Sequence, residues 1–197
     1  MADKYVDIDT LKYMLYDVHN LESLLDRKRF ADHDKESLDM FLDSTKEFAD
    51  RELFPYIKEM DEKPAYHKDG QVYVHSQVDK MMKEGGELGF ISAPFDYEVG
   101  GLQIPLMAHT ASSYILDAAN NHLPGYAGLT TGAAELIIHF ASKELLEKFV
   151  PNMLSGKWGG TMCLTEPQAG SSLSDIVTKA TPSENGYYNI SGQKIFF

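Results

Sequence analysis

The segment with the clearest chemical potential runs from Met162 to Ser171 and reads Met-Cys-Leu-Thr-Glu-Pro-Gln-Ala-Gly-Ser. Thr165 offers a hydroxyl where an apolar stretch ends, and Pro167 stiffens the turn that follows. Gly170 and Ser171 are small, so their backbone N–H groups can approach a ligand closely, and the Ser171 hydroxyl adds a donor. Such a loop suits a phosphate or the polar edge of a ring. An ordinary β-turn is the alternative that the last three residues alone would favour.

The other reactive side chains give weaker signals. Cys163 is the only cysteine, which excludes an intrachain disulfide, and we expect it to be a buried, inert thiol rather than a redox group. The seven histidines are scattered, and no HExxH or Cys/His spacing predicts a metal site. The sequence has neither a GxGxxG after a strand nor a Walker loop.

Composition and charge narrow the class of protein. The 197 residues are 43% hydrophobic and 24% charged, which is typical of an ordered globular chain. A formal net charge of -12 disfavours nucleic acid as a partner. From Gly156 onward, however, three lysines balance three acids, so this part tolerates an anionic ligand best. The polar, acidic start lacks a targeting signal and no apolar run approaches the ~20 residues of a membrane span, which predicts a cytoplasmic protein.

Helical periodicity dominates the elements that precede this loop. The strongest pattern follows Asp34 and continues to Leu53, near Pro55. We expect further helices over 8–25 with a break near Asn20, over a short stretch that Ser76 caps and that ends at Gly85-Gly86, and over 106–119, 126–140 and 144–154. The 126–140 helix is nearly all apolar, which predicts a central place in a bundle. Residues 63–70 and 89–105 are predicted to be loops.

The pattern changes after Ser155-Gly156. Strands are predicted over 158–164, 176–180, 187–190 and 194–197, with a turn at Glu184-Asn185-Gly186. The predicted fold is mainly α, an amino-terminal helical bundle followed by the start of an antiparallel β domain. We expect an extension over 1–35, the helical domain over 36–157 and the β domain over 158–197. Because the last residues resemble the middle of a strand, we expect a truncated chain.

The loop and its surroundings resemble the acyl-CoA dehydrogenase family. The segment from Thr165 to Ser171 is similar to the family signature Thr-Glu-Pro-x-Ala-Gly-Ser. Upstream, 145–158 resembles the family's helix, proline break and Ser-Gly-x-Trp. Downstream, Lys179-Ala180 and the Gly-x-Lys-x-aromatic run over 192–196 match at the expected distance. The first thirty or so residues resemble the extra segment of longer bacterial members, including those similar to methylmercaptopropionyl-CoA dehydrogenase.

The resemblance implies a role for each matching position. An FAD cofactor is implied, with the flavin and its pyrophosphate contacted by Met162, Leu164, Thr165, Gly170, Ser171, Phe196 and Phe197. Ser171 would also meet the CoA part of the substrate. Tyr126, with Leu129 and Thr130, is a candidate for lining an acyl-chain pocket, with plain core packing as the alternative. Ser172 replaces the family's usual Asp, and Phe140 replaces a usual Gly.

The implied reaction oxidises an acyl-CoA to its 2,3-enoyl form. The family's carboxylate base comes from a carboxy-terminal domain, so no catalytic residue is assigned in this chain, and Glu166 is interpreted as structural. The implied partners are acyl-CoA and an acceptor such as an electron-transfer flavoprotein, in a homo-oligomer when full length. The chain by itself is expected to bind FAD weakly or not at all. The alternatives are an acyl-CoA oxidase, another flavoprotein on the same fold, or a non-enzymatic helical interaction module.

Overall fold

Polar caps fix where two of the predicted helices begin. In the computed structural model, which describes residues 5–196, Asp34 accepts a hydrogen bond from the Ser37 amide (2.8 Å), and the Asp34 amide donates to the Ser37 hydroxyl (3.0 Å). This reciprocal capping box starts α2 (Lys35–Phe48). The Ser142 hydroxyl likewise caps α7 (Lys143–Leu154) by accepting from the Leu145 amide (3.4 Å). Both helices begin as the sequence predicts.

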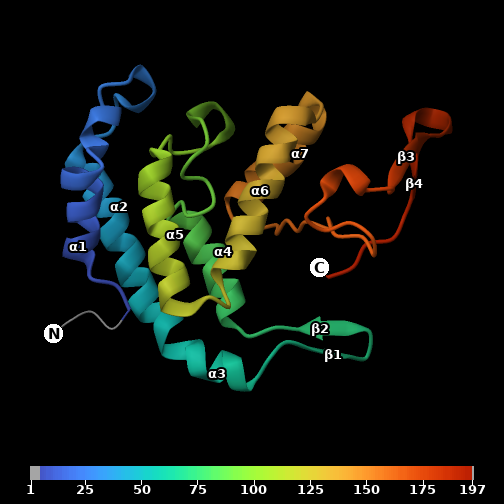
Figure 1. The fold of residues 1–197 in the computed structure, drawn as a ribbon, viewed down its shortest axis with the longest axis horizontal. Helices are drawn as coiled ribbons and strands as arrows, with labels where there is room; N and C mark the ends of the chain where they lie inside the picture. Colours follow the sequence, from blue (N-terminus) through green and yellow to red (C-terminus); the bar gives the residue numbers. More distant parts are fainter. Residues whose placement is uncertain (1–4, 197) are drawn as a thin grey trace. The chain divides into compact units, whose positions relative to one another are not determined.

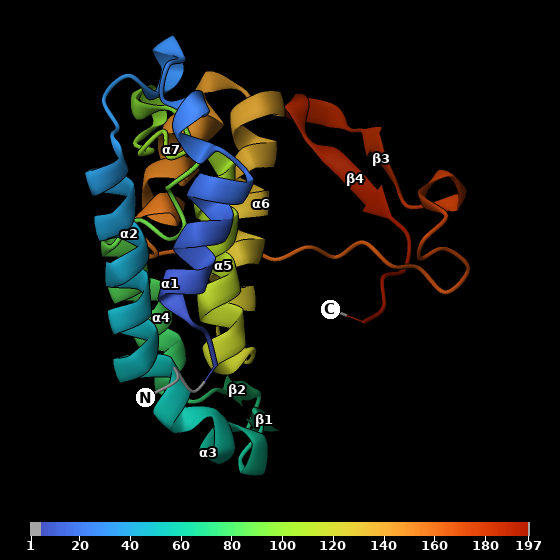
Figure 2. The same ribbon diagram turned by 60° about the vertical axis from the view of Figure 1, so that its left-hand side comes forward.

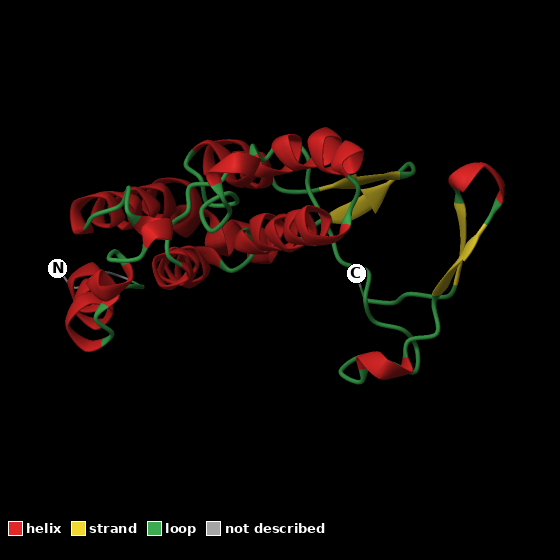
Figure 3. Cartoon of the chain, turned by 90° about the horizontal axis from the view of Figure 1, so that it is seen from above, coloured by secondary structure: helices red, strands yellow, loops and turns green. Residues whose placement is uncertain are grey.

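The chain divides into a helical unit up to Gly160 and a smaller unit from Thr161. The described part of the helical unit has a hairpin of β1 (Tyr66–Lys68) and β2 (Gln71–Tyr73) and otherwise consists mainly of helices (Figures 1 and 3). The remaining α-helices are α1 (Ile8–Tyr13), α3 (Ile57–Glu62), α4 (Gln77–Glu87), α5 (Leu106–Asn120) and α6 (Pro124–Phe140). Short π or 3-10 turns cover Met14–Val18, Leu21–Leu24, Lys28–Phe30, Ala49–Leu53, Phe54–Tyr56 and Tyr97–Val99. None of the helices described over 5–196 has the length and apolarity needed to cross a membrane.

The core of the helical unit lies between α2, α4, α5 and α6. Helix α2 packs against α5, and α6 packs against α4 and α7 (Figure 1). Figure 2 shows α1 in front of α2 and α5. Phe48 is almost fully buried and meets the ring of Phe90 edge-on at a centroid distance of 5.3 Å. The buried stripe of α2 is the one that the sequence predicts, and it continues through Ala49 and Leu53. The predicted break near Asn20 is also present, because Asn20 adopts a left-handed backbone conformation (φ 51°).

The bend at Pro55 is stabilised by side-chain amides from other helices. Pro55 has no N–H to donate, so the helical hydrogen-bond pattern is interrupted there. The Gln77 amide donates to the Glu52 carbonyl (2.8 Å), and the buried Asn120 amide donates to the Leu53 carbonyl (3.0 Å). These bonds connect the bend to α4 and α5.

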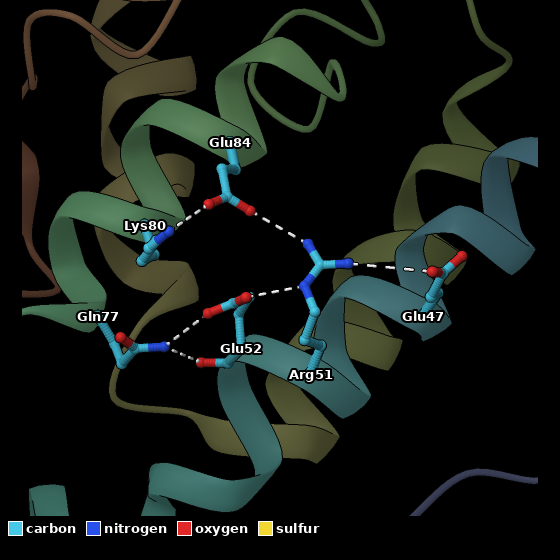
Figure 4. Close-up of polar contacts among 6 residues, drawn as sticks. All are labelled: Glu47, Arg51, Glu52, Gln77, Lys80 and Glu84. Carbon is cyan, nitrogen blue, oxygen red and sulfur yellow. Dashed lines mark hydrogen bonds and ion pairs between the residues drawn. The ribbon is translucent and has the colours of Figure 1, made fainter.

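Charged side chains extend the contact between the bend and α4 (Figure 4). Glu52 accepts from Gln77 (3.0 Å) and from the Arg51 guanidinium (2.7 Å). Arg51 also reaches Glu84 (3.1 Å), which accepts from Lys80 one turn earlier on α4 (2.6 Å). The guanidinium of Arg51 holds the pKa of Glu52 below its ordinary value.

Three predictions about the helical unit are wrong. Gly85-Gly86 does not end α4, and Ser76 precedes that helix without a side-chain cap. A Cβ at Gly86 would lie 2.5 Å from the Ser155 carbonyl oxygen, so glycine is there for close packing against the end of α7. Part of the predicted 63–70 loop is a hairpin of β1 (Tyr66–Lys68) and β2 (Gln71–Tyr73). Positive φ angles at Asp69 (51°) and Gly70 (77°) make the tight turn that antiparallel strands favour.

The third error concerns α6, which is not central. Its buried face is narrow and consists of Pro124, Ala127, Thr130 and Ala134. The opposite face exposes Leu129 (46%), Leu136 (60%) and Phe140 (82%). The nearly all apolar sequence of this helix therefore reflects two apolar faces, and the helical unit covers only one of them.

The smaller unit contains one antiparallel hairpin, β3 (Lys179–Pro182) and β4 (Tyr188–Ser191), with Ala180 opposite Ile190. The predicted turn at 184–186 connects them, with φ of 63° at Asn185. Over 158–164 and 194–196 the described chain forms no strand, contrary to prediction, because neither segment has a ladder partner, and at Phe196 the backbone leaves the extended region (φ 57°). Phe197 lies outside the described residues.

Replacing Gly86 by alanine tests the close contact between α4 and α7. We expect Gly86→Ala to destabilise the helical unit by about 1–3 kcal/mol, because the backbone at Ser155 must move. Gly128→Ala is the control. Its Cβ meets nothing within 4 Å on α6, so it should stabilise by about 0.5–1 kcal/mol. Urea unfolding followed by far-UV circular dichroism measures both, and equal effects would contradict the contact.

A second substitution tests the bend at Pro55. Gln77→Leu removes the donor to the Glu52 carbonyl and should cost about 1–3 kcal/mol of unfolding free energy. Lys80→Met removes one exposed bond to Glu84 on the same helix and should change stability by no more than about 0.5 kcal/mol. The same urea titration compares them, and a Gln77→Leu protein as stable as the wild type would show that the amide is dispensable.

Candidate functional site

A tight turn forms the centre of the predicted ligand-binding loop. The Glu166 amide donates to the Ala169 carbonyl (2.8 Å), and the Ala169 amide donates back to the Glu166 carbonyl (3.1 Å). Pro167 and Gln168 occupy the corner between them. This reciprocal pair closes the turn and directs Gly170 and Ser171 out of it.

The Glu166 carboxylate fixes the turn to two other segments of the smaller unit. One oxygen, Oε1, accepts from the Thr178 amide (3.0 Å) and from Lys194 Nζ (2.8 Å). The other, Oε2, accepts from the Val177 amide (2.9 Å) and from the Gln168 side chain (2.7 Å). Glu166 is only 2% exposed. Four donors around one buried carboxylate satisfy the requirement that a buried charge be paired and hydrogen-bonded.

The electrostatics of this network keep Glu166 ionised. The Lys194 ammonium, followed by hydrogen bonds from Thr178 and Val177, holds the pKa of Glu166 far below its ordinary value of 4.5. A general base needs a free lone pair and a pKa near the working pH. Both oxygens of Glu166 are occupied, so this carboxylate is structural.

The described residues among those predicted to contact a cofactor lie at the surface of the smaller unit. Met162 is 50% exposed, Leu164 37% and Phe196 90%, while Thr165 is half-buried. Gly170 and Ser171 are exposed. None of these is sealed in an apolar interior, so exposed apolar side chains and the Ser171 hydroxyl belong to the surface of the same unit.

Several of these residues are brought together by the backbone. The Ile195 amide donates to the Thr165 carbonyl (2.9 Å), so the segment that carries Phe196 lies against the one that carries Thr165. A Cβ on Gly170 would lie 3.9 Å from the Thr165 methyl group. Tyr126 belongs instead to α6 of the helical unit, where it is 39% exposed.

Two features of the site differ from the sequence-based expectation. Cys163 is exposed and not buried, because it lies in an extended segment that no neighbouring strand covers within the described residues. Lys194 was identified only as part of a motif, whereas it neutralises Glu166 and also donates to the Leu164 carbonyl (2.9 Å). The only available signal was a lysine of fixed spacing in an otherwise apolar run.

Helix α6, which carries Tyr126, also borders a cavity of about 200 Å³ facing α5. Its walls are mostly apolar, with His109 and Asp117 among the polar groups. Burial lowers the pKa of His109, which favours the neutral imidazole, and raises the pKa of Asp117.

Glu166→Gln tests whether the carboxylate orders the loop. The depressed pKa of Glu166 means that its stabilising effect is complete above pH 4.5 and is lost as the pH falls below that value. At neutral pH we expect the Val177 and Thr178 amides to exchange with solvent roughly tenfold faster in Glu166→Gln. Asp175→Asn, an exposed acid in the same unit, is the control and should leave both rates unchanged. Wild-type protection that is independent of acid pH would contradict this role.

The sequence is similar to those of known acyl-CoA dehydrogenases. Over 69 residues, 34% of this chain and 11% of the relative, the chain is 55% identical to a butyryl-CoA dehydrogenase of Syntrophomonas wolfei. Over 110 residues it is 36% identical to a 3-methylmercaptopropionyl-CoA dehydrogenase of Ruegeria pomeroyi, covering 56% of this chain and 19% of the relative. The chain therefore spans well under half the length of these relatives.

The fold has solved counterparts. The structure of butyryl-CoA dehydrogenase from Megasphaera elsdenii superposes with a TM-score of 0.68 at 26% identity, covering 83% of this chain and 41% of that one. The family model described as the acyl-CoA dehydrogenase N-terminal domain matches residues 35–157, which is more than half of the chain. The chain belongs to the acyl-CoA dehydrogenase family, of which it carries the N-terminal domain.

Proposed function

We propose that this chain is part of an FAD-dependent acyl-CoA dehydrogenase that converts an acyl-CoA to the 2,3-enoyl-CoA. The observation that carries the proposal is the Thr165–Ser171 turn, in which Gly170 and Ser171 are exposed while the buried Glu166 carboxylate fixes the turn, in a chain of this family. Relatives named butyryl-CoA and 3-methylmercaptopropionyl-CoA dehydrogenase support an acyl-CoA thioester as the substrate class.

The exposed surface of the smaller unit fits a flavin nucleotide. We assign the ring to the apolar and hydroxyl groups, and the pyrophosphate to the small residues of the turn, where backbone N–H groups are accessible. The assigned contacts are Met162, Leu164, Thr165, Gly170, Ser171, Phe196 and Phe197, the last of which lies outside the described residues. When bound, FAD would supply the hydride acceptor, while the protein binds and orients it.

Substrate contacts are assigned to both units. We assign the Ser171 hydroxyl to the CoA part of the substrate and Tyr126 to its acyl chain. Tyr126 does not itself line the mostly apolar cavity that other residues of α6 border. No catalytic residue is assigned, because Glu166 has no free lone pair, and the general base is placed in the carboxy-terminal domain of the family fold.

Four further expectations stay predictions. They are the domain limits at 35 and 157, the electron-transfer flavoprotein as acceptor, homo-oligomerisation and the cytoplasmic location.

A charge reversal beside the pyrophosphate tests the proposal. The natively expressed gene product that contains this sequence should be yellow and bind FAD. Ser171→Asp places a carboxylate against the phosphates and should weaken FAD binding by roughly tenfold or more. Ser174→Asp makes the same change at an exposed position three residues away and should bind FAD as the wild type does. Flavin absorbance and fluorescence titration give the affinities.

The reaction is tested separately on the wild-type product. Enoyl-CoA formation with an electron-transfer flavoprotein, without oxygen consumption, supports a dehydrogenase, whereas oxygen consumption would indicate an oxidase on the same fold. A colourless product, or a Ser171→Asp variant with unaltered FAD affinity, would overturn the assignment of the turn. The exposed apolar face of α6 would then favour an interaction module.

A further inference from the structure

The Lys194–Glu166 ion pair joins the two segments to which the flavin contacts are assigned. We propose that Lys194 is a positioning residue that holds the Phe196 segment against Thr165 and balances the Glu166 charge beside the flavin. This inference rests on the proposed function, since it concerns the same cofactor surface.

Three short segments converge on one carboxylate. Lys194 Nζ donates to the Glu166 carboxylate (2.8 Å) and to the Leu164 carbonyl (2.9 Å). One ammonium therefore bonds the residues on both sides of Thr165. The adjacent Ile195 amide reaches the Thr165 carbonyl (2.9 Å). Val177 and Thr178 donate to Glu166 from the third segment. The position of Phe196 is therefore set by bonds that start one and two residues before it.

Close backbone packing keeps Lys194 in reach of the carboxylate. A Cβ at Gly192 would overlap Thr178, with the Thr178 Cα only 2.8 Å away. Glycine at this position lets the 192–195 segment approach the segment whose amides bind Glu166. The Gly-x-Lys spacing then places the ammonium at the carboxylate.

The two partners of the ion pair differ in burial. The side chain of Glu166 is 1% exposed and that of Lys194 is 21% exposed. Removing either partner leaves the other with an uncompensated charge in a low-dielectric environment. Flavin reduction adds negative charge, so a nearby unpaired anion opposes it and a nearby unpaired cation favours it.

Removing either partner of the ion pair should therefore shift the flavin reduction potential in opposite directions. In the flavin-loaded native gene product, Lys194→Met should lower the reduction potential of the flavin and Glu166→Gln should raise it. Lys194→Met combined with Glu166→Gln should return the potential toward the wild-type value. Lys179→Met removes an exposed lysine from β3 of the same unit and should leave the potential unchanged. A merely structural pair would shift both single variants in the same direction.

Amide exchange gives a second readout that needs no flavin. In Lys194→Met the Ile195 amide should exchange roughly tenfold faster, and Lys194→Arg should restore part of the protection because it keeps the charge. If the wild-type protein binds flavin but the flavin potentials of the two single variants do not shift, or shift in the same direction, this inference is wrong and the proposed function is unaffected. A wild-type product without flavin overturns the proposed function as well, and unaltered Ile195 exchange overturns the positioning role independently.

Discussion

The buried carboxylate of Glu166 is the interaction on which the smaller unit depends. A unit of this size has little apolar core, and both strands of its hairpin are exposed. Order at the loop comes instead from charge-assisted hydrogen bonds that converge on one side chain from Gln168, Val177, Thr178 and Lys194. Because the Glu166 carboxylate is buried, losing any one donor leaves one of its oxygens without a hydrogen bond. This cost favours the one loop conformation that satisfies all four bonds.

The helical unit is held by a different kind of constraint. Its helices approach closely where glycine replaces a side chain, as at Gly86 against Ser155. At Pro55 the helix bends, and amides from Gln77 and Asn120 bond the carbonyls beside the bend. The polar groups needed to bend a helix are thus supplied by its neighbours, which fixes how α4 and α5 lie against the bend.

Local signals in the sequence predicted much of the fold. Asp34 and Ser142 mark helix starts because a cap acts within three residues, and the apolar stripe of α2 follows from periodicity alone. Signals with two physical meanings failed. Gly85-Gly86 resembles a helix stop, but the reason for glycine at position 86 is the carbonyl of Ser155, which lies far along the chain. The Asp69-Gly70 turn was a usable hairpin signal, which the exposed and short strands around it obscured.

The candidate site was predictable as a motif and not as a network. The resemblance identified the Thr165–Ser171 segment and also implied that Glu166 is a structural part of the loop. The pairing of Glu166 with Lys194, 28 residues later, depends on the hairpin between them and leaves no local pattern. The exposure of Cys163 likewise depends on which strands cover it, which composition does not encode.

The most direct test of this account is a crystal structure of the natively expressed gene product with its cofactor. We expect electron density for a flavin ring against Thr165 and Phe196, with the pyrophosphate at Gly170 and Ser171, and with Lys194 still bonded to Glu166. A flavin bound elsewhere, or a loop covered by protein with no ligand against it, would contradict it.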